Sequence, residues 1–157
     1  MEKIYLAWDD VCRLIDRIVP QISGHFDALM AITLGGIVPG GLFSERLRIQ
    51  QVFIASVYFF QDEDKALDWP IFLQFPDDTS LHGKRILVVD DIWDKGITIT
   101  NVRERIVQAG GEAVTVVLHY RQISSVTPPE VKPDIFGELT ENYIVYPWEA
   151  ERGKLGV

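Results

Sequence analysis

The sequence feature that most constrains the fold is the stretch from Ile86 to Thr98, Ile-Leu-Val-Val-Asp-Asp-Ile-Trp-Asp-Lys-Gly-Ile-Thr. Four apolar residues lead into the pair Asp90 and Asp91, and a short loop with a third carboxylate, a lysine and a glycine follows. This order predicts a buried parallel strand, a ligand-binding loop and the start of a helix. Ligands of open α/β sheets bind at the carboxyl ends of strands. The free N–H groups of a helix N-terminus favour phosphate at the same place.

Strand-like and helix-like segments alternate along the rest of the chain. We expect helices over residues 9–22, 38–47 and 98–109, and strands over 28–33, 52–60, 70–75, 85–89, 113–120, 135–137 and 143–146. The segment 61–68 reads as an acidic loop, Pro76–Asp78 as a turn, and 124–133 as irregular chain. Cys12 lies on the apolar face of the first helix and is expected in the core. The alternation predicts an α/β fold, a mainly parallel twisted sheet flanked by helices, within a single domain over residues 1–157.

Composition excludes several classes of protein. The net charge of −8 argues against a nucleic-acid partner, because affinity for the phosphate backbone comes from clustered Lys and Arg. Cys12 is the only cysteine, so the sequence predicts neither an intrachain disulfide nor a thiolate zinc site. The N-terminus is too polar for a signal peptide, and the longest uncharged run contains four glycines and a proline. We therefore expect a cytoplasmic protein without a membrane span.

The chemistry of the stretch from Asp90 to Thr98 fits a phosphorylated sugar. The two adjacent carboxylates can accept hydrogen bonds from a vicinal diol or hold Mg²⁺. The backbone from Lys95 onwards can form a phosphate cup, because Gly96 allows close approach and the hydroxyl of Thr98 adds a donor. A diol at one end and a phosphate at the other describe a ribose 5-phosphate. Read alone, the acidic pair is as compatible with a solvated turn.

A receiver domain of bacterial signalling is the competing interpretation of this strand. Such domains also carry an acidic pair after an apolar strand, but there the strand begins the domain. Only 66 residues follow Asp91 here, too few for the remaining strand–helix units.

Taken together, Ile86–Thr98 resembles the phosphoribosyl pyrophosphate (PRPP) signature of the type I phosphoribosyltransferases. Ala31–Gly40 is similar to the pyrophosphate loop of the xanthine-guanine branch of that family. Tyr143-Ile144 with the following Pro147–Glu149 resembles the segment that covers the purine base. The resemblance implies the fold of that family, with a small C-terminal hood over about residues 121–157.

The resemblance also implies roles for residues that would bind PRPP. Asp90 and Asp91 would face the ribose hydroxyls, with Asp91 also near Mg²⁺. The pyrophosphate loop would consist of Leu34, Gly35 and Gly36, with the Leu34–Gly35 peptide often cis in this fold. The 5-phosphate would be bound by Lys95, Gly96, Ile97 and Thr98.

Four residues would contact the base. Asp94 would lie beside purine N7 as the catalytic residue, and it would also adjoin PRPP. Tyr143 would stack on the purine, the backbone of Ile144 would read its edge, and Arg121 would contact the 6-oxo group. Two positions depart from the family: Leu34 stands where an arginine is usual, and Arg121 where a lysine is usual, which changes the geometry of the cation.

The function implied is a Mg²⁺-dependent transfer of phosphoribosyl from PRPP to guanine, xanthine or hypoxanthine, in purine salvage. The enzyme is expected to be a homo-oligomer, a dimer or tetramer. Leu34 keeps an alternative open, in which the same fold senses PRPP or a nucleotide without turnover.

Overall fold

The structure, a computed structural model, describes residues 2–60, 69–121 and 131–149. Its helices are α1 (Trp8–Ile18), a 3₁₀ turn η1 (Val19–Gln21), α2 (Ile37–Leu47), α3 (Asp78–Leu81) and α4 (Ile97–Gln108). Its strands are β1 (Lys3–Tyr5), β2 (Ala28–Ile32), β3 (Val52–Phe60), β4 (Trp69–Gln74), β5 (Arg85–Trp93), β6 (Glu112–Arg121), β7 (Ile135–Thr140) and β8 (Tyr143–Val145).

Six strands form the main sheet, in the order β4-β3-β2-β5-β6-β7. All neighbours are parallel except the β3–β4 pair. From β2 the chain crosses through α2 to β3 on one side, and from β5 it crosses through α4 to β6 on the other. The boundary between β2 and β5 is therefore the topological switch point, where open α/β sheets bind their ligands.

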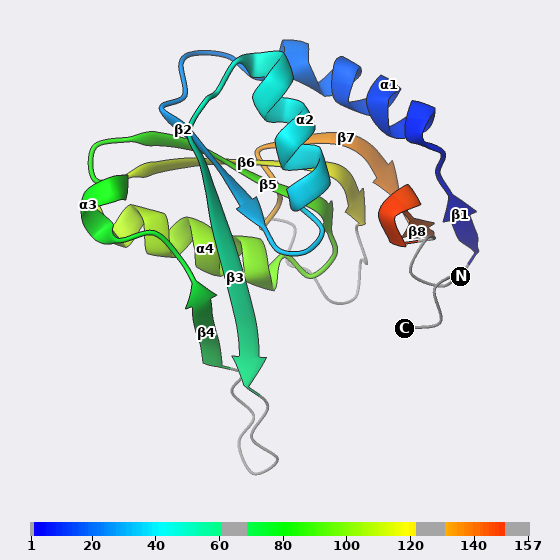
Figure 1. Ribbon diagram of the computed structural model, residues 1–157. Helices are drawn as coiled ribbons and strands as arrows, with labels where there is room; N and C mark the ends of the chain where they lie inside the picture. Colours follow the sequence, from blue (N-terminus) through cyan, green and yellow to red (C-terminus); the bar gives the residue numbers. More distant parts are fainter. Residues whose placement is uncertain (1, 61–68, 122–130, 150–157) are drawn as a thin grey trace.

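Helices cover both faces of the main sheet, α1 and α2 on one face and α4 with the short α3 on the other (Figure 1). The central strands are apolar on both sides, and every residue of β2 is buried. One face contributes Leu29, Leu87 and Val89 to the core beneath α1 and α2. The other contributes Met30, Val88 and their neighbours to the core beneath α4. This double coverage is what continuous apolar strands predict.

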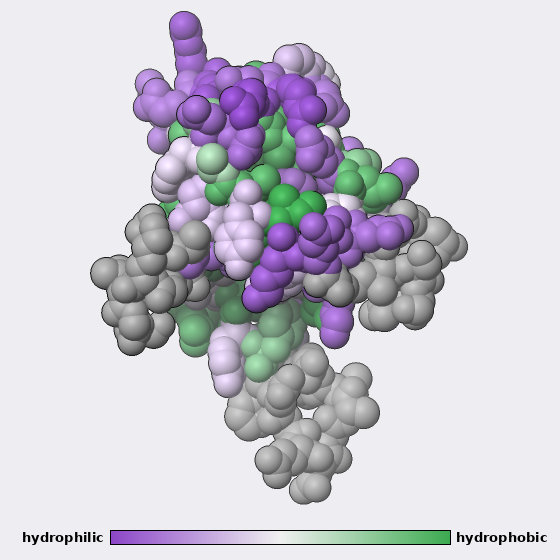
Figure 2. Space-filling view, turned by 90° about the vertical axis from the view of Figure 1, so that its right-hand side faces the viewer, coloured by the Kyte–Doolittle hydropathy of each residue, from purple (hydrophilic) through white to green (hydrophobic). Residues whose placement is uncertain are grey.

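A second, two-stranded sheet lies beside the main one, where β1 pairs in parallel with β8. The two chain ends of the described structure thus meet on one side of the molecule. Figure 2 views this side, on which hydrophilic side chains separate small apolar patches. Within the segment expected as the hood, β8 belongs to this small sheet while β7 extends the main sheet.

The α/β fold class is confirmed, and several details differ from the sequence prediction. The first helix ends at Ile18, four residues early, and continues as the 3₁₀ turn. Strand β5 continues through the acidic pair to Trp93 instead of ending at Val89. Asp77 lies not in a simple turn but at the N-cap of α3, where its side chain accepts a hydrogen bond from the Ser80 N–H. Strand β1 was not predicted.

Cys12 is half-buried beside Arg46 rather than part of the core. The predicted acidic loop 61–68 and most of the predicted irregular segment 124–133 lie outside the described residues. No helix within the described ranges is long and apolar enough to cross a membrane.

Candidate functional site

The residues predicted to bind PRPP lie at the carboxyl ends of β2 and β5, on either side of the switch point, and in the loop after β5, whereas Arg121 ends β6 and Tyr143 and Ile144 lie in β8. The turn 33–36 follows β2, and Asp91 in β5 lies against it. A Cβ added to Gly35 would stand 2.5 Å from the Asp91 carboxyl, and one added to Gly36 would stand 2.2 Å from the Val89 carbonyl oxygen. Glycine at these two positions therefore lets the turn approach β5 as closely as it does.

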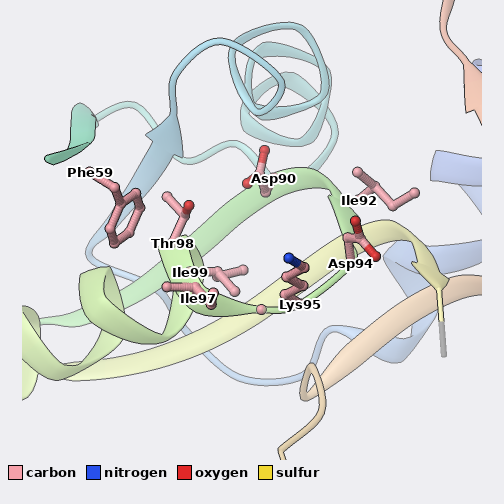
Figure 3. Close-up of a pocket in the computed structure, with 9 residues that line it drawn as sticks. Phe59, Asp90, Ile92, Asp94, Lys95, Ile97, Thr98 and Ile99 are labelled. Carbon is pink, nitrogen blue, oxygen red and sulfur yellow. The ribbon is translucent and has the colours of Figure 1, made fainter. Parts of the chain in front are cut away.

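The first cavity at this edge has a volume of about 350 Å³, within the range of small-molecule sites. Figure 3 shows Asp90 from β5, Thr98 from the start of α4 and Phe59 from β3 around it, with Lys95 and Asp94 in the loop between β5 and α4. The cavity thus combines a carboxylate at one end with a helix N-terminus at the other.

The loop between β5 and α4 owes its shape to Gly96. This residue is the N-cap of α4 and has a φ of 72°, a conformation that glycine adopts without strain. A Cβ here would lie 2.3 Å from the indole of Trp93, which is buried directly beneath the loop. The buried indole therefore supports the loop that leads to the first N–H groups of α4.

The carboxyls of Asp90 and Asp91 are buried close to other carboxylates. The Asp90 carboxylate accepts a hydrogen bond from the Asp91 N–H at 2.9 Å. Burial and the Asp91 charge raise the pKa of Asp90, and burial together with Glu149 raises the pKa of Asp91. Within the ranges the structure describes, neither carboxylate forms an ion pair with Lys, Arg or His. A bound cation or hydroxyl donors would therefore stabilise the charged forms of both carboxylates.

A second cavity of about 200 Å³ adjoins the first, and Asp94 lines both. Arg121 at the end of β6 forms a two-point ion pair with Asp94, with Nε 3.0 Å from Oδ1 and Nη2 close to Oδ2. Tyr143 is 44% exposed at the rim, with its ring centroid 5.9 Å from the Arg121 guanidinium, and Ile144 is buried in the wall. The Tyr143 ring thus lies beside the Asp94–Arg121 pair at the rim of this cavity, where a flat heterocycle could stack on its free face.

Tyr146 and Glu149 also line the second cavity, and Trp148 packs against Tyr146. The ring of Tyr146 stacks on that of Trp148, with centroids 4.7 Å apart. The Glu149 carboxylate accepts a hydrogen bond from the Tyr146 N–H. The buried Trp148 indole N–H lies close to the Asp91 carboxyl and lowers the pKa of Asp91, in opposition to burial.

The structure brings most of the predicted residues together, in two groups. Residues 94–98 line the first cavity with Asp90, whereas Asp91, Arg121, Tyr143 and Ile144 line the second with Asp94. Leu34 is 62% exposed in the turn after β2. The expected cis peptide is displaced by one residue: the cis bond is Thr33–Leu34, not Leu34–Gly35.

Sequence reasoning gave no role to Phe59, Trp93 or Tyr146. Trp93 and Tyr146 lie within segments that resemble the family, but at positions to which the resemblance assigns no contact, and Phe59 lies near the end of β3 outside any motif. In the described part of the chain, no three His, Cys, Asp or Glu side chains cluster closely enough to hold a metal ion.

Comparison with known proteins agrees with this geometry. The sequence profile of the family described as "Phosphoribosyl transferase domain" matches residues 2–150. The chain is 26% identical to a xanthine-guanine phosphoribosyltransferase of Gluconobacter oxydans over 92% of this chain and 83% of that protein. It is 28% identical to the enzyme of that name from Idiomarina loihiensis, over 94% and 87%. A purine phosphoribosyltransferase from Pyrococcus horikoshii superposes with a TM-score of 0.79, at 29% identity and 95% coverage of both chains.

Proposed function

Because this chain belongs to the phosphoribosyl transferase family, we propose that it transfers the 5-phosphoribosyl group of PRPP to a 6-oxopurine and releases pyrophosphate. The acceptor would be guanine, xanthine or hypoxanthine, and the reaction would serve purine salvage. The observation that carries the proposal is the pair of adjoining cavities that share Asp94. One has the chemistry for a phosphorylated sugar and the other for a flat base. The names of the relatives support a purine.

The first cavity supports a mode of binding for PRPP. The N–H groups at the start of α4 and the Thr98 hydroxyl would bind the 5-phosphate, as helix N-termini bind anions. Asp90 in this cavity, together with Asp91 in the wall of the second, would accept hydrogen bonds from the ribose hydroxyls. Their negative charge would also stabilise the oxocarbenium-like cation that develops at the anomeric carbon as pyrophosphate departs.

The pyrophosphate would lie at the turn 33–36. Its N–H groups would bind the leaving group, since the glycines allow close approach to Asp91. Mg²⁺ fits this place: the Asp91 carboxyl is an oxygen ligand without a cationic partner in the described structure. Mg²⁺ is typically held by one or two carboxylates together with substrate phosphates. When bound, it supplies neutralisation of the charge on the departing pyrophosphate.

The second cavity supports the role of Asp94 as the catalytic residue. Its carboxylate would accept the N7 proton of the purine and hold the base in line with the anomeric carbon. Arg121, which can only donate hydrogen bonds, would bind an oxo group at position 6 and not an amino group. Tyr143 would stack on the ring, and the buried Ile144 would present its backbone to the base edge.

A second candidate function rests on Leu34. The resemblance leads us to expect an arginine there, and the exposed leucine leaves the pyrophosphate turn without that cation. A protein of this fold that binds PRPP or a nucleotide without turnover would need no such charge.

One assay separates the two functions. The purified chain is mixed with PRPP, Mg²⁺ and one of guanine, xanthine, hypoxanthine or adenine, and ribonucleotide is measured. Product from a 6-oxopurine but not from adenine supports the enzyme, whereas tight binding of PRPP without product supports the sensor. Asp94→Asn should lower turnover by about 10²-fold, the typical effect of a lost acid–base group, with PRPP affinity nearly retained. Unchanged turnover would contradict the role of Asp94.

A further inference from the structure

A buried hydroxyl lies behind the acidic pair. Tyr146 is 1% exposed, and its Oη is 2.9 Å from the backbone carbonyl oxygen of Asp91. The same Oη is 2.8 Å from Nδ1 of His119, which is 2% exposed in β6. The hydroxyl therefore joins three segments that are distant in sequence: the C-terminal part of β5, the C-terminal part of β6 and the chain after β8.

The direction of these hydrogen bonds follows from counting protons. A carbonyl oxygen only accepts, so the single hydroxyl proton of Tyr146 is donated to Asp91. Nδ1 of His119 must then carry a proton and donate it to the phenol oxygen. Nε2 of His119 lies 3.8 Å from Glu138 Oε2, beyond hydrogen-bonding distance. It faces a groove of about 480 Å³ between α1 and the β6–β7 edge, in which Arg17 pairs with Glu138.

The end of β5 needs support from outside the main sheet. Its register pairs with β2 end at Val89, while those with β6 continue to Trp93. From Asp90 onward, the strand is therefore supported by one sheet neighbour. The hydroxyl of Tyr146 supplies a second attachment at Asp91, the residue whose carboxyl also lies against Gly35.

We propose that Tyr146, oriented by the Nδ1–H of His119, is a positioning residue for the acidic pair. It fixes the Asp91 backbone, and with it the direction in which the Asp91 carboxyl meets the pyrophosphate turn. The inference rests on the proposed function, since it concerns the affinity for PRPP. Nothing in it requires Tyr146 to touch a substrate.

The test is calorimetric titration of PRPP with Mg²⁺ into matched variants. Tyr146→Phe keeps the ring that stacks on Trp148 and removes only the hydroxyl. We expect its dissociation constant for PRPP to rise about tenfold, the lower end for partners that orient a ligating group. Tyr120 follows His119 in β6 and lies on the opposite face of the sheet from Tyr146. Tyr120→Phe removes its hydroxyl and should bind PRPP as tightly as the wild type does.

Variants of His119 separate positioning from stability. His119→Leu removes the N–H and should weaken PRPP binding as Tyr146→Phe does. His119→Asn keeps an N–H near the place of Nδ1 and should remain within about threefold of wild type. The thermal midpoint of each variant is recorded alongside. Should the midpoints fall while every dissociation constant stays unchanged, Tyr146 would be merely structural and the inference would be wrong.

The outcomes distinguish this inference from the proposed function. If the wild type binds PRPP and both Tyr146→Phe and His119→Leu bind it equally well, the positioning role alone is lost. If the wild type does not bind PRPP with Mg²⁺, the proposed function fails and the inference fails with it. If Tyr146→Phe does not fold, the contrast between His119→Leu and His119→Asn decides, and equal affinities would refute the inference.

Discussion

Gly36 offers a quantitative test of how tightly the turn after β2 packs against β5. Its backbone has helical dihedral angles, φ −77° and ψ −10°, which alanine adopts without strain. The cost of Gly36→Ala must therefore come from contacts. The added Cβ would lie 2.2 Å from the Val89 carbonyl oxygen and 2.8 Å from the nitrogen and oxygen of Ile32, whereas real Cβ atoms essentially never come closer than 3.0 Å.

The magnitude follows from what would have to move. All three crowded atoms belong to the backbone of β2 or β5, so no side chain can rotate away. Relieving the contact with Val89 needs a shift of about 0.8 Å between the turn and the strand. Overpacking of this kind costs about 1–3 kcal/mol. For a chain of this size, each kcal/mol lowers the melting temperature by about 2–4 °C. We therefore expect Gly36→Ala to lower both the unfolding free energy and the affinity for PRPP.

Gly41→Ala is the matched control, because it makes the same chemical change at a position where the added Cβ has free space around it. Gly41 lies inside α2, and a Cβ there meets nothing within 4 Å. Alanine is favoured over glycine in a helix interior by about 0.5–1 kcal/mol. Urea unfolding should therefore give changes of opposite sign for the two variants. Equal midpoints, or a Gly36→Ala variant as stable as the wild type, would refute the packing argument.

Three further predictions concern the site and its support. Leu34→Arg adds a cation at an exposed position of the turn 33–36, so kcat/KM for PRPP should rise about tenfold. An equal rise in the uncharged variant Leu34→Gln would show that charge is not the cause. Tyr143→Ala should raise KM for the purine about tenfold through lost stacking and change KM for PRPP less, so equal effects would remove the stacking role. Burial lowers the pKa of His119 from 6.5 to about 4, so as the pH falls this imidazole is protonated in the unfolded chain before it is protonated in the folded one. Stability should fall by about 3 kcal/mol as pH drops from 6.5 to 4, and a His119→Asn variant with the same pH slope would contradict this.

The sequence predicted the parts of the site that are continuous in the chain. Residues 90–98 combine a strand, a loop and a helix start within a few residues, so local pattern and function coincide there. The alternation of apolar strands with helices predicted the class of fold, because this order can also be read from the local pattern of residues. The strand boundary was misplaced because the acidic pair looks like the end of β5, although pairing with β6 carries the strand on to Trp93.

The rest of the site depends on contacts between distant segments. Sequence reasoning assigned Asp94 and Arg121 to separate atoms of the base, and only the fold reveals that they pair with each other. The cis bond at Thr33–Leu34 differs by one residue from the expectation, because a resemblance locates a turn more reliably than a single peptide. Strand β1 is three residues long, and its partner lies some 140 residues away, so no local pattern could mark it.

The pairing of β1 with β8 has a consequence for the order in which the molecule opens. Three register pairs join the N-terminal strand to the strand that carries Tyr143 and Ile144, whereas the core strands are buried on both faces. Segments with few buried contacts exchange their amide protons through local fluctuations rather than through complete denaturation. The base-covering strand should therefore detach and return while the six-stranded sheet stays intact. If the chain makes a nucleotide as proposed, the product would depart through this partial unfolding, while the edge formed by β2 and β5 keeps its structure.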